Sequence, residues 1–230
     1  MSDNIYYEMI KDFKHKIEKY ATEIFKVYGN ELQLRLEDYN LLTNDKNCLE
    51  SSTAFGYIIE EFLVSKLEIY SQNHTENEYV IQRTDGSTTT SSYDCFSMLG
   101  DIKVLVNIKA DRKNNNAIAA INRLYNDYVL EDPKKIKAYL VFKVHYHIGV
   151  SERDFKRKIF IDNISSFFLE EIDFSEGHQQ DKRSWSEVYN PNSGRLQATA
   201  AFRLEHKVAV ENISYENTRI MINKIFERKN

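Results

Sequence analysis

The chain has 230 residues, of which 42% are hydrophobic and 13% aromatic, a composition that suits one sizeable core and argues against intrinsic disorder. Its net charge of −4 excludes a general attraction for nucleic acid, so any such contact must come from local basic clusters. No apolar run approaches the ~20 residues that span a bilayer, and the start MSDNIYYEMIKDF is too charged for a secretory signal. We therefore expect a soluble cytoplasmic protein. Cys48 and Cys95 form no metal or disulfide pattern, which agrees with a reducing compartment.

Two amphipathic helices are predicted in the first third of the chain. The first covers residues 4–28, and its apolar positions recur every three or four residues, at Ile5, Met9, Phe13, Ile17, Tyr20, Ile24 and Val27. The second covers residues 51–70, and its buried stripe is predicted to contain Phe55, Ile58, Ile59, Phe62, Leu63 and Leu67. Between the two helices, residues 31–47 should form a short helix followed by a polar loop.

Residues 92–111, SYDCFSMLGDIKVLVNIKAD, are predicted to form a β-hairpin. Aromatic, polar and β-branched residues suit two strands at 93–98 and 104–108, and Gly100 beside an aspartate marks the reversal between them. Asn107 and Lys109 are two residues apart on the second strand, so they share a face while Ile108 points into the core. Asp94, on the first strand, would lie beside them at one end of the sheet.

Helices and strands are both predicted before and after this hairpin. Residues 173–198 form the least regular part of the chain. Their length and polarity are typical of a functional loop. The other expected elements are a strand at 79–83, a helix at 117–130 ended by Asp132-Pro133, strands at 138–148 and 158–161, a short helix or turn at 164–172, a strand at 200–210 and a helix at 215–227.

The hairpin and the second helix together supply the groups that a metal-dependent phosphodiesterase needs. A hard divalent cation prefers oxygen ligands such as carboxylates, a backbone carbonyl and water. The metal polarises the phosphate and lowers the pKa of a bound water, while a lysine can orient that water and stabilise developing charge. His145 and His147 share a strand face but lack a third ligand, so we expect a structural role for them. Trp185 is expected to pack rather than to stack on a base.

The order of these parts resembles the PD-(D/E)xK nuclease superfamily, and within it the type II restriction endonucleases. The matching pieces are GYIIE at 56–60, YDCF around Asp94, VLVNIKA around Asn107 and Lys109, and a following helix that carries NRLY. The resemblance covers about residues 50–146. It implies an α/β fold, mixed α+β in detail, with a restriction-endonuclease-like core of a central mixed β-sheet flanked by helices. We expect a single domain over 1–230, with the catalytic core at about 50–162 and an irregular DNA-reading subdomain at about 173–205.

The resemblance also assigns roles to single residues. Asp94 would bind Mg²⁺ directly, with Mn²⁺ as a substitute, Glu60 would assist from the helix, and the Ile108 carbonyl would be a backbone ligand. Lys109 would be the catalytic lysine. Asn107 stands where the family has an acid; its side-chain oxygen can still bind a metal, but the site loses one negative charge. Metal affinity should therefore fall unless another carboxylate compensates.

Two points stay open from the sequence. Asp101-Ile102-Lys103 is literally a D-x-K, although its place beside Gly100 favours a turn. Either Glu60 or Glu61 can face the site.

What the resemblance implies about activity is Mg²⁺-dependent, sequence-specific cleavage of both strands of double-stranded DNA at a short palindrome, leaving 5′-phosphates, by a homodimer in the bacterial cytoplasm. A structure-specific nuclease for repair or resolution, and a nuclease-like fold that has lost catalysis and only binds DNA, are the alternatives. Basic runs such as 153–158 would contact phosphates, and polar loops would contact base edges. The residues expected to contact DNA are Gln82, Arg83, Thr88, Ser91, Arg112, Lys113, Asn114, Asn115, Lys156, Arg157, His178, Gln179, Gln180, Lys182, Arg183, Asn192, Arg195 and Gln197.

Overall fold

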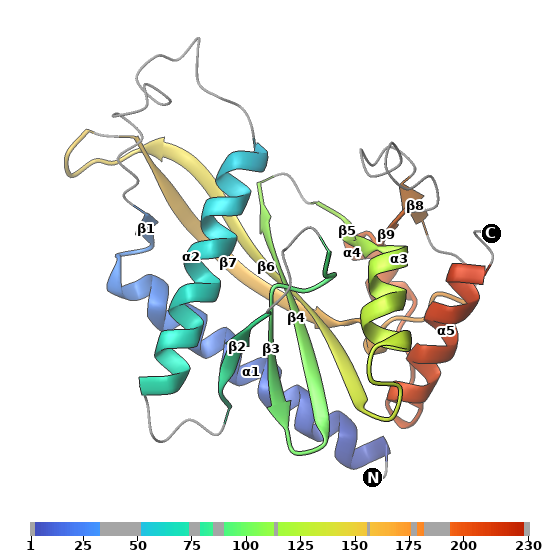
Figure 1. Ribbon diagram of the computed structural model, residues 1–230. Coiled ribbons are helices and arrows are strands. Elements are labelled where there is room, and N and C mark those ends of the chain that lie inside the picture. The colour runs from blue at the N-terminus through green and yellow to red at the C-terminus, as the bar shows by residue number, and fades with distance from the viewer. Residues whose placement is uncertain are drawn as a thin grey trace.

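A six-stranded mixed β-sheet forms the centre of the computed structural model (Figure 1), which describes residues 3–32, 52–73, 79–84, 90–112, 115–155, 157–175, 179–181 and 194–227. The strand order is β1-β7-β6-β4-β3-β2. Strands β4 and β6 are parallel, and the other neighbours are antiparallel. The strands are β1 (Glu31–Leu32), β2 (Ile81–Arg83), β3 (Cys95–Leu99), β4 (Ile102–Asp111), β6 (Ile136–Val150) and β7 (Arg157–Phe168).

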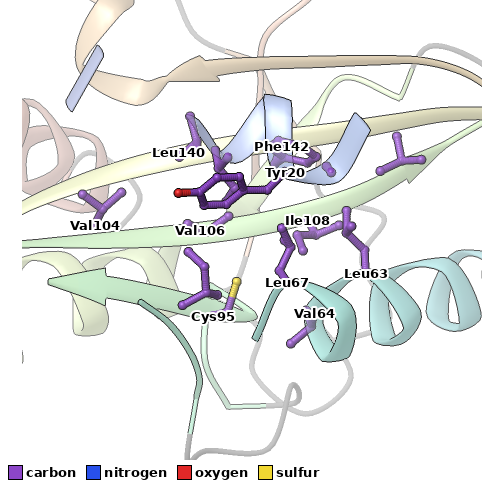
Figure 2. Packing of buried hydrophobic residues seen from close by; sticks show 14 of the residues in the cluster. Tyr20, Leu63, Val64, Leu67, Cys95, Val104, Val106, Ile108, Leu140 and Phe142 are labelled. Atoms are coloured by element: carbon purple, nitrogen blue, oxygen red, sulfur yellow. The ribbon is translucent and has the colours of Figure 1, made fainter. Parts of the chain in front are cut away.

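The helices α1 (Asp3–Val27) and α2 (Ser52–Asn73) pack on one face of this sheet. Figure 2 shows Leu63, Val64 and Leu67 of α2 beside Val106 and Ile108 of β4. Both helices were predicted, but the buried stripe of α1 is displaced at its two ends. Its first and last predicted members, Ile5 and Val27, are exposed, and the buried side chains include Tyr6, Ile10, Ala21 and Phe25. The apolar spacing alone therefore does not identify which residues at the two ends of α1 are buried.

A second core covers the opposite face of the sheet and includes a smaller sheet of order β5-β9-β8. This small sheet joins the segment directly after β4 to the C-terminal third of the chain, because β5 and β8 both pair with β9. In Figure 1 it lies to the right of the upper end of β4, near the upper ends of α3 and α5. Its elements and their neighbours are β5 (Ala117–Ala120), α3 (Ile121–Tyr125), a π-helix (Asn126–Leu130), a 3₁₀ turn (Leu169–Glu171), β8 (Gln179–Asp181), β9 (Arg195–Gln197), α4 (Ala200–Glu205), a 3₁₀ turn (Val210–Asn212) and α5 (Tyr215–Glu227).

The predicted central hairpin is confirmed. Strands β3 and β4 pair antiparallel with Cys95 opposite Val106, and Gly100 turns between them with φ of 58°, a conformation that glycine adopts readily. The strands β2 and β6 and the helix α5 are also confirmed.

The predicted strand at 200–210 is wrong, and the predicted elements at 117–130 and 164–172 are wrong in their first residues, since 121–130 are helical and 169–171 form a 3₁₀ turn. Each difference has a physical reason. Residues 117–120 were expected in a helix but form β5, because pairing with β9 outweighs the helical preference of its alanines. Residues 164–168 continue β7 instead of turning, since they pair with β6 from Leu140 to Val144. Residues 200–205 form helix α4 rather than a strand, and Thr199 caps it by accepting a hydrogen bond from the Phe202 N–H.

The start of the segment after α1 also differs from the prediction, because Glu31–Leu32 is a strand paired with β7 rather than part of a short helix. The rest of residues 33–47 lies outside the described residues. The predicted mixed α/β fold class is confirmed, with helices on both faces of a mixed sheet, and it is consistent with a restriction-endonuclease-like core. In the part of the chain that the structure describes, no helix combines the length and apolar character that crossing a membrane requires.

Candidate active site

Asp94 lies immediately before β3, at the point where β3 stops pairing with β4. Its backbone N–H donates to the Val106 carbonyl at 2.9 Å, and its own carbonyl accepts from Thr84 N at 3.3 Å. Its side-chain Oδ2 accepts a hydrogen bond from Ile108 N at 2.7 Å. Because β3 begins only at Cys95, the Ile108 amide of β4 is available to hold the Asp94 carboxylate.

Glu60 reaches the same strand from α2. Its Oε1 accepts a hydrogen bond from the Ala110 N–H at 3.2 Å, whereas the neighbouring Glu61 binds Arg83 at 2.6 Å through its Oε2. Glu60 is therefore the glutamate that contacts β4. Gly56, one turn earlier, lies where α2 packs on β4, with its missing Cβ position 3.8 Å from the Ala110 Cβ.

The two carboxylates thus occupy the backbone amides of Ile108 and Ala110, two residues apart along one edge of β4. In an extended strand the N–H and C=O of a residue point to the same edge. The Ile108 carbonyl consequently faces the edge that holds both acids, and its expected role as a metal ligand stays a prediction. Lys109 lies between these two residues, partly exposed.

The electrostatics tie these groups together. Burial raises the pKa of Glu60 from the usual 4.5 to about 6; nearby Lys109 opposes this increase and Asp94 adds to it. Burial also raises the pKa of Asp94, while Lys109 and the hydrogen bond from Ile108 lower it. Two poorly solvated acids beside one cation are typical of a functional site rather than of a surface ion pair.

A small cavity of about 50 Å³ opens onto this cluster, large enough to hold water. Among the residues that line it are Tyr57, Glu60, Thr84 and Asp94. Arg83 also lines the cavity, and its guanidinium is held there by Glu61 and by the Ser65 hydroxyl at 2.6 Å. Arg83, predicted to contact DNA, therefore lies next to the two acids.

Asn107 is 2% exposed, and its amide is fully engaged as a donor. Its Nδ2 donates to the Ile118 carbonyl at 2.9 Å and to the Tyr139 hydroxyl at 2.8 Å. Its expected role as a metal ligand stays a prediction. Sequence reasoning missed Tyr139. The signal was its place on β6, a strand buried on both faces next to β4, but the pairing register that sets it near Asn107 is not visible in the sequence.

The alternative D-x-K lies at the opposite end of β4 from Lys109. Asp101 is in the turn between β3 and β4, and the Lys103 Nζ donates to Tyr93 and Glu131 at 3.3 Å each.

The two histidines of β6 have separate partners. His145 Nε2 contacts Ser165 Oγ at 2.9 Å, and His147 Nδ1 contacts Asp162 Oδ1 at 2.6 Å.

The oxygen ligands around Asp94 suit Mg²⁺ better than a structural metal ion that is coordinated by protein side chains alone. Within the described residues, no group of three or more His, Cys, Asp and Glu side chains could hold an ion. Mg²⁺ keeps several waters and is commonly held by one or two carboxylates together with substrate phosphates. Asp94, Glu60 and the Ile108 carbonyl meet that requirement, whereas a structural zinc site would need four protein ligands.

The residues expected to contact DNA are only partly described. Lys158, in the basic run 153–158, is buried with its Nζ 2.9 Å from Glu31 and 3.0 Å from Asp154, so its charge is already paired. Gln82, Arg112 and Asn115 are exposed, and Ser91, Arg195 and Gln197 are partly exposed. The strands contain Arg157, Gln179 and Gln180, whose side chains are not described; Thr88, Lys113, Asn114, Lys156, His178, Lys182, Arg183, Trp185 and Asn192 lie outside the described residues.

Two of these predicted contacts sit on the small sheet, at the end of β4 that carries Lys109. Arg195 and Gln197 are two apart on β9 and so share a face, while Leu196 between them is buried. The loop after β4 ties this sheet to the site strand, because the Asn115 N–H donates to Asp111 Oδ1 at 2.8 Å. The Asn115 side chain is used within the loop, where its Oδ1 accepts from Ala117 N.

No family model matches the chain, and neither does any curated protein. Among solved structures, the NlaIV restriction endonuclease is similar over 79% of this chain and 73% of its own length, with 17% sequence identity and a TM-score of 0.38. A likeness of this size does not bear on function, which is inferred instead from the contacts of Asp94 and Glu60 on either side of Lys109.

Proposed function

We propose that the protein is a Mg²⁺-dependent endodeoxyribonuclease whose active site contains Asp94, Glu60 and Lys109. The observation that carries the proposal is the pair of carboxylates anchored on the Ile108 and Ala110 amides of one strand edge, with Lys109 between them. Glu60 comes from helix α2 and Asp94 from the segment before β3, so the two acids reach this strand edge from separate elements of the fold.

Each residue has a chemical task in this reaction. Asp94, Glu60 and the Ile108 carbonyl would hold the metal, which when bound supplies Lewis acidity and an activated water. The Lys109 ammonium would orient the attacking water and stabilise the negative charge that builds on the phosphoryl oxygens. The water loses a proton as its oxygen forms a bond to phosphorus, the bond from phosphorus to O3′ breaks, and O3′ takes up a proton from solvent, so the products are a 5′-phosphate and a 3′-hydroxyl.

Two carboxylates remain at the site although position 107 carries no acid. Mg²⁺ is commonly held by one or two carboxylates together with substrate phosphates, and Asp94 with Glu60 provides two at the same strand edge. The site therefore keeps enough carboxylates for Mg²⁺, with one negative charge fewer than the resembled family has.

We further propose a type II restriction activity: cleavage of both strands of double-stranded DNA at a short palindrome by a homodimer, in a bacterial cell, with Mn²⁺ able to replace Mg²⁺. A two-fold dimer matches a two-fold DNA site and cuts each strand once. The small sheet would read bases through Arg195 and Gln197, because arginine pairs well with guanine and glutamine with adenine. Because the small sheet is attached to the end of β4, the residues that contact bases would lie beside the active site.

Digestion of phage DNA tests this function. With Mg²⁺ the wild-type protein should give discrete fragments, and with EDTA it should give none. The variant Lys109→Ala should give none under either condition, while Lys19→Ala, which removes an exposed lysine of α1, should behave as wild type. Cleavage without discrete bands would indicate a structure-specific nuclease instead.

A second candidate is a nuclease-like module that binds DNA without cutting it. Asn107 favours it, since this buried amide stands where the resembled family has a carboxylate. The absence of cutting with both Mg²⁺ and Mn²⁺, together with retained DNA binding, would decide for this candidate.

A further inference from the structure

Asn107 connects three parts of the molecule through its side chain. One amide hydrogen goes to the Ile118 carbonyl of β5, which belongs to the small sheet, and the other goes to the Tyr139 hydroxyl of β6. All three residues are buried. Asn107 directly precedes Ile108, the hydrogen-bond partner of Asp94, on β4. Its side chain therefore joins the strand of the site to the small sheet.

The Tyr139 hydroxyl links Asn107 to the segment that contains Asp94. It donates a hydrogen bond to the Ser92 carbonyl. The Ser92 N–H in turn donates to the Asp127 carboxylate, so both backbone groups of Ser92 are held. Ser92 is two residues before Asp94, in a stretch outside regular secondary structure, where side-chain contacts of this kind fix the backbone.

Donor and acceptor chemistry explains why position 107 carries an amide. A tyrosine hydroxyl has one hydrogen, and that of Tyr139 is given to Ser92, so the Tyr139 oxygen is an acceptor toward Asn107. The Ile118 carbonyl is an acceptor as well. The residue at 107 must therefore donate twice, which an ionised carboxylate is unable to do.

We propose that Asn107 is a positioning residue that acts through Tyr139 and Ser92 to hold Asp94 in place for the metal. Through its hydrogen bond to Ile118, the same side chain also fixes the small sheet to β4. The part of this inference that concerns metal binding rests on the proposed function, whereas the effect of Asn107 on the backbone around Asp94 does not. An acid at 107 adds a charge that should attract a cation. It also breaks two buried hydrogen bonds, and the loss of one such bond changes an equilibrium constant by about 5- to 100-fold. Positioning therefore outweighs the added charge.

Two measurements on the intact chain test this proposal, and the first needs no metal. In EDTA, hydrogen exchange of the backbone amides of residues 92–95 should be faster in Asn107→Asp and in Tyr139→Phe than in wild type. The matched control is Asn73→Asp, which adds the same charge at the exposed far end of α2 and should exchange as wild type. Unchanged exchange in both site variants would overturn the proposal.

The second measurement is Mn²⁺ binding by calorimetry without DNA. We expect Asn107→Asp to bind Mn²⁺ at least about fivefold more weakly than wild type, and Asn73→Asp to bind it equally well. Because Asn107 and Tyr139 act along one path, Asn107→Ala combined with Tyr139→Phe should be little worse than the weaker single variant. Tighter binding by Asn107→Asp would overturn the positioning role. A wild-type protein that binds no Mn²⁺ would instead refute the metal site, and hydrogen exchange would still decide the role of Asn107.

Discussion

Replacing Glu60 by glutamine should stabilise the metal-free protein and weaken metal binding at the same time. The pKa of Glu60 is raised by burial from the usual 4.5 to about 6. A group with a raised pKa contributes its full stability below pH 4.5 and loses it as the pH rises through 6. The difference of about 1.5 in pKa corresponds to at most about 2 kcal/mol of unfolding free energy at neutral pH.

Glutamine carries no charge, and its side-chain oxygen can still accept the hydrogen bond from Ala110. We therefore expect Glu60→Gln to raise the free energy of unfolding by up to about 2 kcal/mol at pH 8 and by less than about 1 kcal/mol at pH 5. Urea unfolding in EDTA at these two pH values measures this change. Equal effects at both pH values, or destabilisation at pH 8, would refute the electrostatic description of the site.

Three further predictions test other parts of the structure. Lys109→Ala should keep DNA binding in a gel-shift assay and lower the single-turnover cleavage rate by at least about 100-fold; retained cleavage would place the catalytic lysine elsewhere. Burial raises the pKa of Glu170 to about 8, so unfolding free energy should fall by roughly 2 to 3 kcal/mol from pH 6 to pH 9, and Glu170→Gln should remove that fall in urea titrations. Arg195→Ala and Gln197→Ala should each relax base preference about tenfold in cleavage of a randomised DNA library, whereas the exposed Gln72→Ala on α2 should not; unchanged preference in both would exclude the small sheet from base reading.

The parts of the fold that the sequence predicted are those with a strong local pattern. Helices α1 and α2 have long apolar periodicities, and the β3–β4 hairpin has a glycine at its turn. The failures lie where distant pairing decides the structure. Residues 117–120, AIAA, suit a helix by composition, but β9 pairs with them from about 75 residues away in the chain. Nothing local records that partner.

In the candidate site too, local patterns were predictable and contacts between distant segments were not. Asp94 and Lys109 were predicted on neighbouring strands with Glu60 on the preceding helix, and the structure places Asp94 and Glu60 on the amides that flank Lys109 in β4. The network behind the site was not predictable, because it depends on the parallel register of β4 and β6, which brings Tyr139 close to Asn107. The sequence therefore suggested a missing ligand at 107, whereas the structure reveals a double donor with its own partners.

Mg²⁺ titration of plasmid cleavage, with wild-type protein and Asp94→Asn compared side by side, tests the central claim most directly. Asparagine keeps the size of the side chain and an oxygen that can accept from Ile108, but it removes the charge that the metal needs. We predict that wild-type protein linearises supercoiled plasmid in proportion to Mg²⁺ until saturation, and that Asp94→Asn leaves the plasmid intact at every concentration. Equal, Mg²⁺-dependent cleavage by both proteins would contradict the assignment of this site.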